Sequence, residues 1–468
     1  MKPSELILEK LPFQPTPGQE KALRLMDSFI SDKQSARPLF LLKGFAGTGK
    51  TTLVSALVNV IEKLGYNYIL MAPTGRAAKV MSSYSGKYAS TIHRQIYQPE
   101  KADSAGGMSF RRKKNTLSKT LFIIDEASMI SNEADFGKQG LLADVLDYAF
   151  EKKDNKVLLV GDTAQLPPVK LNLSPALDGD YIKSRFFITL YEHELTEVVR
   201  QEVESGILAN ATALRKNISD NIPLASFITK GYKDIYRMTG EKLEDGLRYA
   251  YKKYDIENTI LITRSNKAAT GYNQYIRRTI KAMDDEISVG DLLMVVKNNY
   301  FVLPEDSPAG FLANGEFVEI MRIIRYEELH GFRFANVELR LLDYPKHPKF
   351  EAKIFMDTLY SSNPNITQEE NKKLFDSVWK DYAAEFVSKR AIIEAVKSDK
   401  HFNALQVKFA YALTCHKSQG GQWDAVFIDQ GYLTEENMNT EYLRWLYTAI
   451  TRASKEVFLV NFHDRFFV

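Results

Sequence analysis

Residues 44 to 51 read Gly44-Phe45-Ala46-Gly47-Thr48-Gly49-Lys50-Thr51, a complete G-x-x-x-x-G-K-T phosphate-binding loop. It follows an apolar run at 39–42 and precedes a segment with the apolar period of a helix, an order that disfavours a simple glycine-rich turn. In such a loop, glycines let backbone N–H groups curl around phosphate oxygens, and the helix N-terminus favours anions. We expect Lys50 to reach the β- and γ-phosphates and the Thr51 hydroxyl to ligate Mg²⁺. The residues predicted to bind the nucleotide are Gly44, Ala46, Gly47, Thr48, Gly49, Lys50, Thr51 and Thr52.

Composition narrows the class of protein. The chain has 468 residues, of which 44% are hydrophobic, enough for roughly two to four folded domains. Its 62 Lys and Arg against 59 Asp and Glu give a net charge of only +3, so any nucleic-acid surface must be local. Cys415 is the only cysteine, which excludes a disulfide within one chain and suits a reducing cytoplasm. We also expect no signal peptide and no membrane span, because the N-terminus and the apolar runs lack those patterns.

Two sets of strand-like apolar runs alternate with helical patterns. The first set lies at 39–42, 68–71, 121–124, 157–160 and 186–190, and the second at 260–263, 407–412, 425–428 and 457–460. Continuously apolar strands imply a parallel sheet with helices on both faces, so each set predicts an α/β lobe. We assign 1–84 and 117–195 to the first lobe, and 196–288 and 404–468 to the second.

The second lobe is interrupted at 289–403. The insertion begins β-rich with Asn/Gly turns, which is the spacing of a small antiparallel barrel, and becomes helical at 367–398. A capping box of Thr367 and Glu370 opens the helical part. Its apolar stripe predicts a helix packed on the barrel rather than a partner-binding helix.

A shorter insertion, at 85–116, interrupts the first lobe. It contains the basic run 111–114, for which a solvated loop and a nucleic-acid contact are both open interpretations. Tyr97 and Phe110 flank the run, and aromatic rings beside cations suit stacking on unpaired bases.

Polar side chains follow two strands of the first lobe. Asp125 and Glu126 come directly after the run 121–124. We expect Asp125 to hold Mg²⁺ and Glu126 to orient or deprotonate the water that attacks the γ-phosphate. The next strand ends in 161–169, where the Gln165 amide could touch the γ-phosphate and report its loss.

The order of these and further motifs resembles the superfamily 1 helicases, in the RecD-like and Dda-like branch that translocates 5′ to 3′. The motifs are Thr16–Gln19 (Q-motif), Gly44–Thr51 (I), Ala72–Ala78 (Ia), Ala89–His93 (Ib), Asp125-Glu126 (II), Gly161–Val169 (III), Glu194–Gln201 (IV), Thr414–Gly420 (V) and Leu446–Ala453 (VI). The resemblance implies an α/β fold of two RecA-like P-loop lobes. It places a pin or wedge at 85–116 and an SH3-like β-barrel with a helical extension at 289–403.

The resemblance also implies roles for single residues. Gln19 would hydrogen-bond adenine, and Gly420 would line the nucleotide. Arg200 and Arg452 would bring positive charge to the γ-phosphate when the lobes close, so that ATP turnover ratchets a bound strand. The residues expected to contact DNA are Thr74, Thr91 and His93 in the first lobe and Thr414, His416 and Lys417 in the second, with Tyr97 and Phe110 as candidates for the pin.

The expected activity is ATP-dependent 5′-to-3′ translocation on single-stranded DNA and unwinding of tailed duplex DNA, with ATP and Mg²⁺ as cofactors. We expect a cytoplasmic protein that is active as a monomer, with replication, repair or recombination proteins as candidate partners. Three alternatives stay open. One is a nuclease-helicase that uses Asp343, Glu351 and Lys353, one is a nucleic-acid-binding scaffold switched by ATP, and one is an RNA helicase of the same superfamily.

Overall fold

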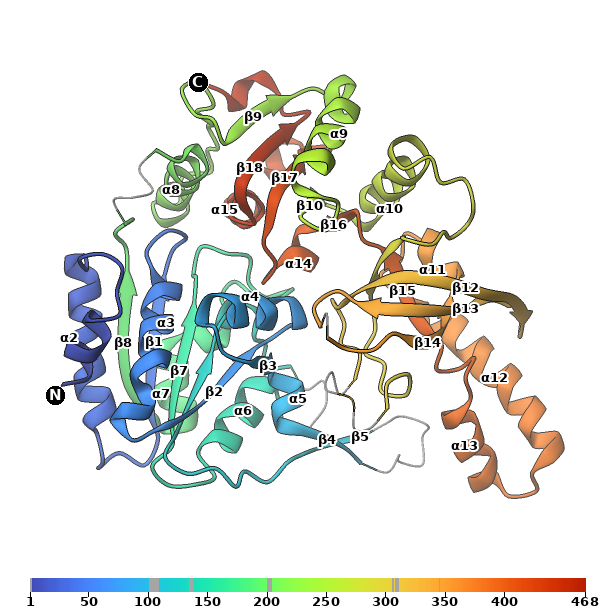
Figure 1. Ribbon diagram of the computed structural model, residues 1–468, viewed down its shortest axis with the longest axis horizontal. Coiled ribbons are helices and arrows are strands. Elements are labelled where there is room, and N and C mark those ends of the chain that lie inside the picture. Colours follow the sequence, from blue (N-terminus) through green and yellow to red (C-terminus); the bar gives the residue numbers. More distant parts are fainter. Residues whose placement is uncertain are drawn as a thin grey trace.

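The computed structural model describes residues 2–100, 109–133, 139–199, 204–304, 307, 311–344 and 346–468. The first lobe is built on a six-stranded, entirely parallel sheet. Its strands are β1 (Pro38–Gly44), β2 (Asn67–Ala72), β3 (Ala89–Thr91), β6 (Thr120–Ile124), β7 (Lys156–Gly161) and β8 (Thr189–Leu195). They lie in the order β3-β2-β6-β7-β1-β8 (Figure 1).

Helices bury both faces of this sheet. Alternate residues of each strand point to opposite faces, so that Phe40 and Leu42 join one core while Leu39 and Leu41 join the other. The helices against the first core are α1 (Pro3–Leu8), α2 (Pro17–Ser31), α3 (Lys50–Val60) and α4 (Gly75–Ser85). Those against the second are α5 (Ile92–Ile96), α6 (Leu141–Ala149) and α7 (Gly179–Phe186). The continuously apolar runs in the sequence reflect this two-sided burial.

The second lobe repeats the design with a five-stranded parallel sheet. Its strands are β9 (Ile235–Met238), β10 (Thr259–Thr263), β16 (Ala412–Thr414), β17 (Trp423–Asp429) and β18 (Ala453–Val460), in the order β16-β10-β17-β18-β9. Its helices are α8 (Gly206–Ser219), α9 (Leu243–Tyr254), α10 (Asn266–Tyr275), α14 (Cys415–Ser418) and α15 (Thr440–Ile450). Thus two α/β lobes lie in one chain, as the sequence predicts.

A closed five-stranded barrel interrupts the second lobe. It consists of β11 (Leu292–Val295), β12 (Phe317–Leu329), β13 (Phe332–Leu341), β14 (Phe350–Phe355) and β15 (Leu405–Phe409). Between β14 and β15 the chain forms α11 (Asp357–Tyr360), α12 (Gln368–Glu385) and α13 (Lys389–Ser398). The Thr367–Glu370 capping box is present, and the apolar stripe of α12 packs on barrel residues Phe332, Phe334 and Phe355. This confirms the predicted helix packed on the barrel.

The strand predicted at 407–412 is in fact two strands in different sheets. Its first half lies in β15 and closes the barrel, while its last residue, Ala412, begins β16 of the second lobe. Asn273 fixes the crossing, because its side chain bonds the backbone of Tyr411 and Ala412. The barrel therefore takes its last strand from the segment that we assigned to the second lobe. A continuous apolar run cannot show where a chain leaves one sheet for the next.

The run at 186–190 was also placed imperfectly, since Phe186 ends α7 and β8 begins at Thr189. The strand continues through Glu192, His193 and Glu194 at the edge of the sheet, and charged residues are common on edge strands. The other seven predicted strands lie within β1, β2, β6, β7, β10, β17 and β18, and are confirmed.

A buried ion pair joins the barrel to the second lobe. Arg277, in a π-helical turn after α10, donates from Nε and Nη2 to the two carboxylate oxygens of Asp291, both at 2.9 Å. The Tyr411 hydroxyl also donates to Asp291, at 2.7 Å. The carboxylate thus ties together the places where the chain enters and leaves the barrel.

We predict that Arg277→Met lowers the free energy of unfolding by about 3–5 kcal/mol, because Asp291 would stay buried without its cation. Urea unfolding followed by circular dichroism measures the change. Arg278→Met is the matched control, because Arg278 is the next residue in the chain and its side chain is exposed. Equal midpoints for the two variants would contradict the prediction.

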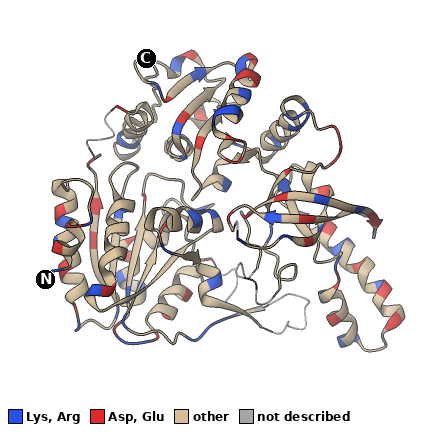
Figure 2. Cartoon of the chain, in the orientation of Figure 1, with Lys and Arg blue, Asp and Glu red and all other residues tan. Residues whose placement is uncertain are grey.

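Charges of both signs are spread over both lobes and the helical insertion (Figure 2), in keeping with the small net charge. None of the helices formed by the described residues combines the length and the apolar character needed to cross a bilayer.

Candidate nucleotide site and nucleic-acid interface

The phosphate-binding loop joins β1 to α3 as the sequence predicts. Gly47 and Gly49 have φ angles of 75° and 81°, a conformation that favours glycine. A Cβ on Gly49 would lie 2.5 Å from the side-chain nitrogen of Gln19, so the loop excludes one there on steric grounds as well. Lys50 starts α3 and donates from Nζ to the Phe45 carbonyl at 2.8 Å, which holds its ammonium group over the loop.

Gln19 lies directly against this loop. It is fully buried at the start of α2, where its Oε1 accepts from the Thr16 N–H at 3.0 Å and its Nε2 donates to the Thr48 carbonyl at 3.0 Å. The side chain therefore braces the loop, and the adenine contact stays a prediction.

The carboxylates of Asp125 and Glu126 follow β6. Asp125 accepts from the Tyr84 hydroxyl of α4 at 2.7 Å. Burial, with the adjacent charge of Glu126, raises the pKa of Asp125 to about 6, and Lys50 opposes this shift. Glu126 has a φ of 54°, which is rare outside glycine and is often found at functional sites. Sequence reasoning missed Tyr84, because no motif marks a tyrosine at the end of a helix.

The donors at this position suit a magnesium ion. Mg²⁺ prefers oxygen ligands and often takes one or two carboxylates together with phosphate oxygens. Asp125 supplies a half-buried carboxylate directly after β6, and Thr51 offers an exposed hydroxyl in the first turn of α3. These residues therefore fit the predicted metal.

Arg452 reaches the first lobe from the second. It is only 4% exposed and lies just after α15, where its Nε donates to the Thr448 carbonyl at 3.1 Å and its Nη1 to the Gly421 carbonyl at 3.3 Å. Its Nη1 lies 3.7 Å from Glu126 Oε1. The arginine predicted for the γ-phosphate thus contacts the predicted water-orienting carboxylate across the lobes.

The second predicted arginine, Arg200, lies outside the described residues. The chain just before it reaches the loop, because the Val199 N–H donates to the Gly47 carbonyl at 3.0 Å.

The segment 162–166, which is part of motif III (Gly161–Val169), lies between the lobes. Ala164 and Leu166 belong to the hydrophobic core of the second lobe although they follow β7 of the first. The Leu166 backbone also binds the second lobe, since its N–H donates to Thr448 Oγ1 at 2.8 Å and its carbonyl accepts from Gln419 at 2.7 Å. Gln165 is buried, and its Oε1 has no hydrogen-bond partner among the described residues.

Two residues of α15 at this junction were missed by the sequence reasoning. Arg444 donates to the backbone carbonyls of Thr163 and Gln165. The Tyr447 hydroxyl accepts from the Ala46 N–H of the loop at 2.8 Å and donates to Asp162 Oδ2 at 2.6 Å. Tyr447 lies within motif VI and Arg444 lies two residues before it, but nothing in that pattern indicates which side chains reach the first lobe.

Motif Ia and motif V, one from each lobe, meet at a close contact. Thr74 caps α4 by accepting the Ala77 N–H at 3.2 Å. Gly420 has a φ of 71°, and a Cβ there would lie 2.7 Å from Ala77 Cβ and 3.2 Å from Thr74 Oγ1. The structure thus places Gly420 against α4, and its predicted contact with the nucleotide remains a prediction.

The other motif V residues lie at the start of α14. Thr414 ends β16, and His416 is exposed. Lys417 donates to Asn314 Oδ1 of the barrel at 2.7 Å, and burial lowers its pKa to about 8. Lys417 therefore links α14 to the barrel.

The motif Ib residues are more enclosed than we predicted. Thr91 is 3% exposed and caps α5 through the Arg94 N–H, while burial lowers the pKa of His93 to about 4. Tyr97 is 7% exposed, and its hydroxyl donates to Asp144 at 2.7 Å. The proposed stacking of Tyr97 on bases is therefore wrong for this structure, because the ring belongs to the core. An aromatic residue beside a basic run does not reveal on which side its ring is buried.

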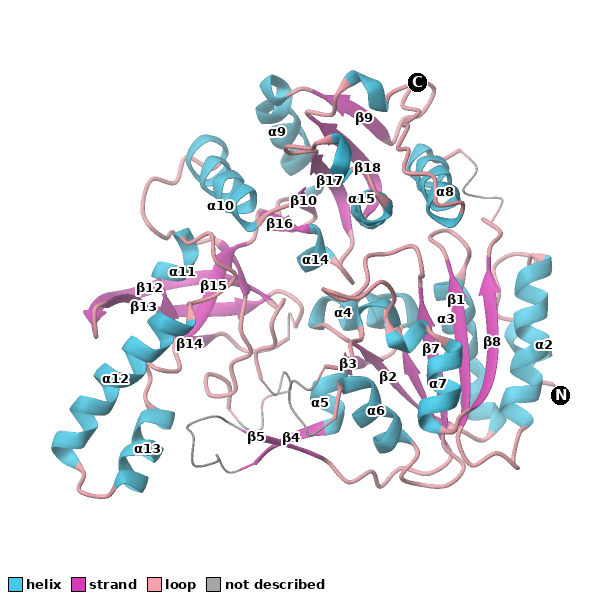
Figure 3. Ribbon diagram, turned by 180° about the vertical axis from the view of Figure 1, so that it is seen from behind, coloured by secondary structure: helices cyan, strands magenta, loops and turns pink. Residues whose placement is uncertain are grey.

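Phe110 occupies a hairpin of β4 (Tyr97–Glu100) and β5 (Ser109–Arg112) that extends toward the barrel (Figure 3). Its ring centroid lies 4.3 Å from that of Tyr300, next to the barrel. Residues 101–108, which separate β4 from β5 in the sequence, lie outside the described residues.

The residues of the nuclease interpretation each have a partner of opposite charge. Asp343 Oδ1 lies 3.7 Å from Arg76 and 3.2 Å from Lys79, both on α4. Glu351 pairs with Arg322 at 3.5 Å, and Lys353 pairs with Glu327. Since these three side chains are engaged with separate partners, the structure gives no support to a shared metal site.

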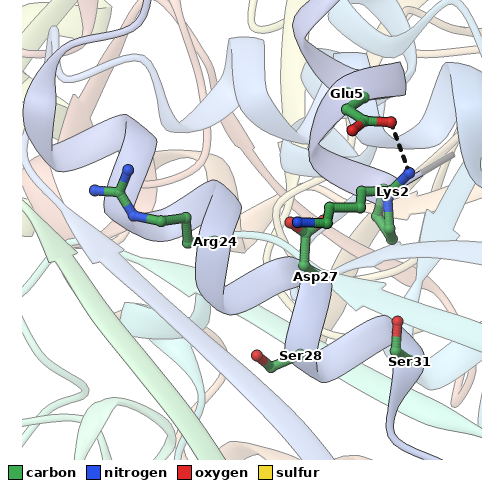
Figure 4. A pocket seen from close by; sticks show the side chains of 7 residues that line it. Lys2, Glu5, Arg24, Asp27, Ser28 and Ser31 are labelled. Carbon is green, nitrogen blue, oxygen red and sulfur yellow. Dashed lines mark hydrogen bonds between the residues drawn. The ribbon is translucent and has the colours of Figure 1, made fainter.

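A separate pocket of about 720 Å³ lies on α1 and α2 (Figure 4). Lys2 and Glu5 line its upper side, and Arg24, Asp27, Ser28 and Ser31 come from α2. None of the predicted site residues lines this pocket, so the nucleotide site does not coincide with it.

Two family models match the chain, one in each lobe, and known proteins match it over most of its length. A family model described as an AAA domain matches residues 16–224, and one described as a UvrD-like helicase C-terminal domain matches 409–460. The chain is 24% identical to the ATP-dependent DNA helicase Dda of Enterobacteria phage T4, over 95% of this chain and 99% of that protein. It is 26% identical to the uncharacterized protein R530 of Acanthamoeba polyphaga mimivirus, over 94% of this chain and 98% of that protein.

A third relative matches only part of each chain. The ATP-dependent RecD2 DNA helicase of Deinococcus radiodurans is 34% identical over 42% of this chain and 24% of its own length. In its two matched domains and over most of its length, the chain is thus similar to proteins that include ATP-dependent DNA helicases.

Proposed function

We propose that the chain hydrolyses ATP at the junction of its two lobes and uses the energy to move 5′ to 3′ along single-stranded DNA and to unwind tailed duplexes. The observation that carries this proposal is the 3.7 Å contact between Arg452 of the second lobe and Glu126 of the first. Phosphoryl transfer needs positive charge close to the negatively charged equatorial oxygens of its transition state. An arginine from the second lobe makes that charge depend on how the lobes meet.

The roles proposed for the first-lobe residues follow from their positions. Lys50 binds the β- and γ-phosphates, and Glu126 orients the attacking water. Thr51 and Asp125 would hold Mg²⁺, which when bound neutralises charge on the phosphates. Gln165 lies in the segment that both lobes share, so it is placed to report a change at the γ-phosphate.

We propose the strand path from the contacts between α4, α14 and the barrel. Thr74, Thr414, His416 and Lys417 would contact the DNA backbone, while Phe110 is the remaining candidate for the pin. In this scheme the units are 1–84 with 117–195, 85–116, 196–288 with 404–468, and 289–403, with β15 shared between the last two. We further propose a monomer that works in the cytoplasm in repair or recombination.

Two alternatives lose support from particular contacts. The separate ion pairs of Asp343, Glu351 and Lys353 disfavour a nuclease. A scaffold that used ATP only as a switch would not need Arg452 buried against Glu126. The third alternative, an RNA helicase, is distinguished by comparing unwinding of DNA and RNA duplexes.

We predict that the protein unwinds duplexes with a single 5′ tail and leaves 3′-tailed duplexes at background. Strand release from fluorescent DNA duplexes, with matched RNA duplexes in parallel, measures polarity and substrate together. Binding to the single strand should weaken steeply with salt, because it depends on phosphate contacts. Release only from 3′-tailed substrates would refute the polarity, and a preference for RNA would refute the DNA assignment.

A further inference from the structure

We propose that Tyr447 couples occupancy of the phosphate-binding loop to the contact between the lobes. The inference rests on the proposed function, because it concerns how the same nucleotide site is read by the second lobe. It assigns to Tyr447 a positioning role through hydrogen bonds.

The Tyr447 side chain bridges three parts of the molecule. It is 1% exposed on α15 of the second lobe. Its hydroxyl accepts from the Ala46 N–H at 2.8 Å and donates to Asp162 Oδ2 at 2.6 Å. Burial raises the pKa of Tyr447 well above its ordinary value, so the phenol stays protonated and can donate and accept at the same time.

Ala46 gives this bridge a direct relation to the nucleotide. It is the third residue of the loop, whose backbone N–H groups form the cradle for phosphate oxygens. An N–H group makes one strong hydrogen bond, so a phosphate oxygen that binds it must displace the Tyr447 hydroxyl. Nucleotide and tyrosine therefore compete for the same donor.

Displacement of Tyr447 would be felt in the segment 162–166. Asp162 Oδ2 would lose its phenol donor, while Oδ1 still accepts from the Ala164 N–H at 2.9 Å. Ala164 and Leu166 pack in the core of the second lobe, and Arg444 binds the same segment. Phosphate binding in the first lobe is thus linked to a segment that the second lobe holds.

The test compares Tyr447→Phe with Tyr442→Phe, a buried tyrosine of the same helix whose hydroxyl has no hydrogen-bond partner among the described residues. The measured quantity is the affinity for a fluorescent, non-hydrolysable ATP analogue with Mg²⁺ and without DNA. We expect Tyr447→Phe to bind about 3- to 10-fold more tightly than wild type, since one competing hydrogen bond is gone. Tyr442→Phe should stay within about twofold. Unchanged or weaker binding by Tyr447→Phe would overturn the inference.

A second readout separates this role from a merely structural one. Amide hydrogen exchange in 162–166 should rise when the analogue binds to wild type, and should already be raised without nucleotide in Tyr447→Phe. If Tyr447→Phe fails to fold, the wild-type measurement still decides. In that case the proposal is overturned when amide exchange in 162–166 does not rise on binding of the analogue. If wild type does not bind the analogue at all, the proposed function fails. If wild type binds it and Tyr447→Phe behaves like Tyr442→Phe, only the inference about Tyr447 fails.

Discussion

Lys50→Ala is expected to lower the DNA-stimulated ATPase rate by about 10³-fold or more, while affinity for single-stranded DNA stays within about twofold of wild type. The reason lies in its place in the loop. Lys50 is the first residue of α3, and its ammonium group already lies over the loop backbone through the Phe45 carbonyl. Without that charge, the β- and γ-phosphates lose the cation that the loop brings to them. Phosphate release with saturating DNA, and fluorescence anisotropy of a labelled strand, give the two quantities.

The matched control for this variant is Lys63→Ala. Lys63 is exposed in the 3-10 turn that follows α3. Its substitution therefore removes one positive charge beyond the far end of α3 and leaves the phosphate-binding loop unchanged. It should change the ATPase rate less than twofold, roughly the scale of a surface substitution. Normal turnover by Lys50→Ala would mean that ATP is hydrolysed somewhere other than at this loop.

Most of the sheets could be predicted from the sequence, and the reason is their burial. Strands such as β1 and β7 are covered on both faces, so nearly every residue in them is apolar and the run is easy to recognise. The edge strand β8 carries Glu192, His193 and Glu194, and its position was therefore misjudged. The change from barrel to second lobe at Tyr411 depends on Asn273 and Asp291, which lie far away in the sequence.

The candidate site divides in the same way. Local spacing within a motif marks Lys50 in motif I, and likewise the neighbouring pair Asp125 and Glu126 in motif II. The positions of these residues could therefore be predicted. Tyr447 could not, because its contact with Ala46 joins positions 401 residues apart and depends on how the two lobes meet. Tyr97 shows the converse error, since its flanking cations suggested a surface role while Asp144 binds its hydroxyl inside the lobe.

The position of Glu126 shows why the second lobe matters for catalysis. Its backbone is left-handed, with a φ of 54°, and its Oε1 lies 3.7 Å from Arg452 Nη1. At this distance the two side chains attract each other as opposite charges. Any movement of α15 that carries Arg452 toward the γ-phosphate also changes the partner of Glu126. The proposed water-orienting group and the arginine proposed to stabilise the transition state are therefore linked through one contact.

Arg452→Lys is accordingly expected to lose about 10³–10⁵-fold in DNA-stimulated hydrolysis while binding of the ATP analogue changes less than about threefold. Lysine keeps the positive charge but lacks the planar fork of donors, with which Arg452 binds the Thr448 and Gly421 carbonyls while lying 3.7 Å from Glu126. Single-turnover hydrolysis, with the analogue affinity measured beside it, separates chemistry from binding. Arg278→Lys, an exposed arginine of the same lobe, serves as the control and should hydrolyse ATP at the wild-type rate. A wild-type rate in Arg452→Lys would show that the guanidinium is not needed at the γ-phosphate. An equal loss of binding and hydrolysis would instead assign Arg452 to nucleotide affinity and not to transition-state stabilisation.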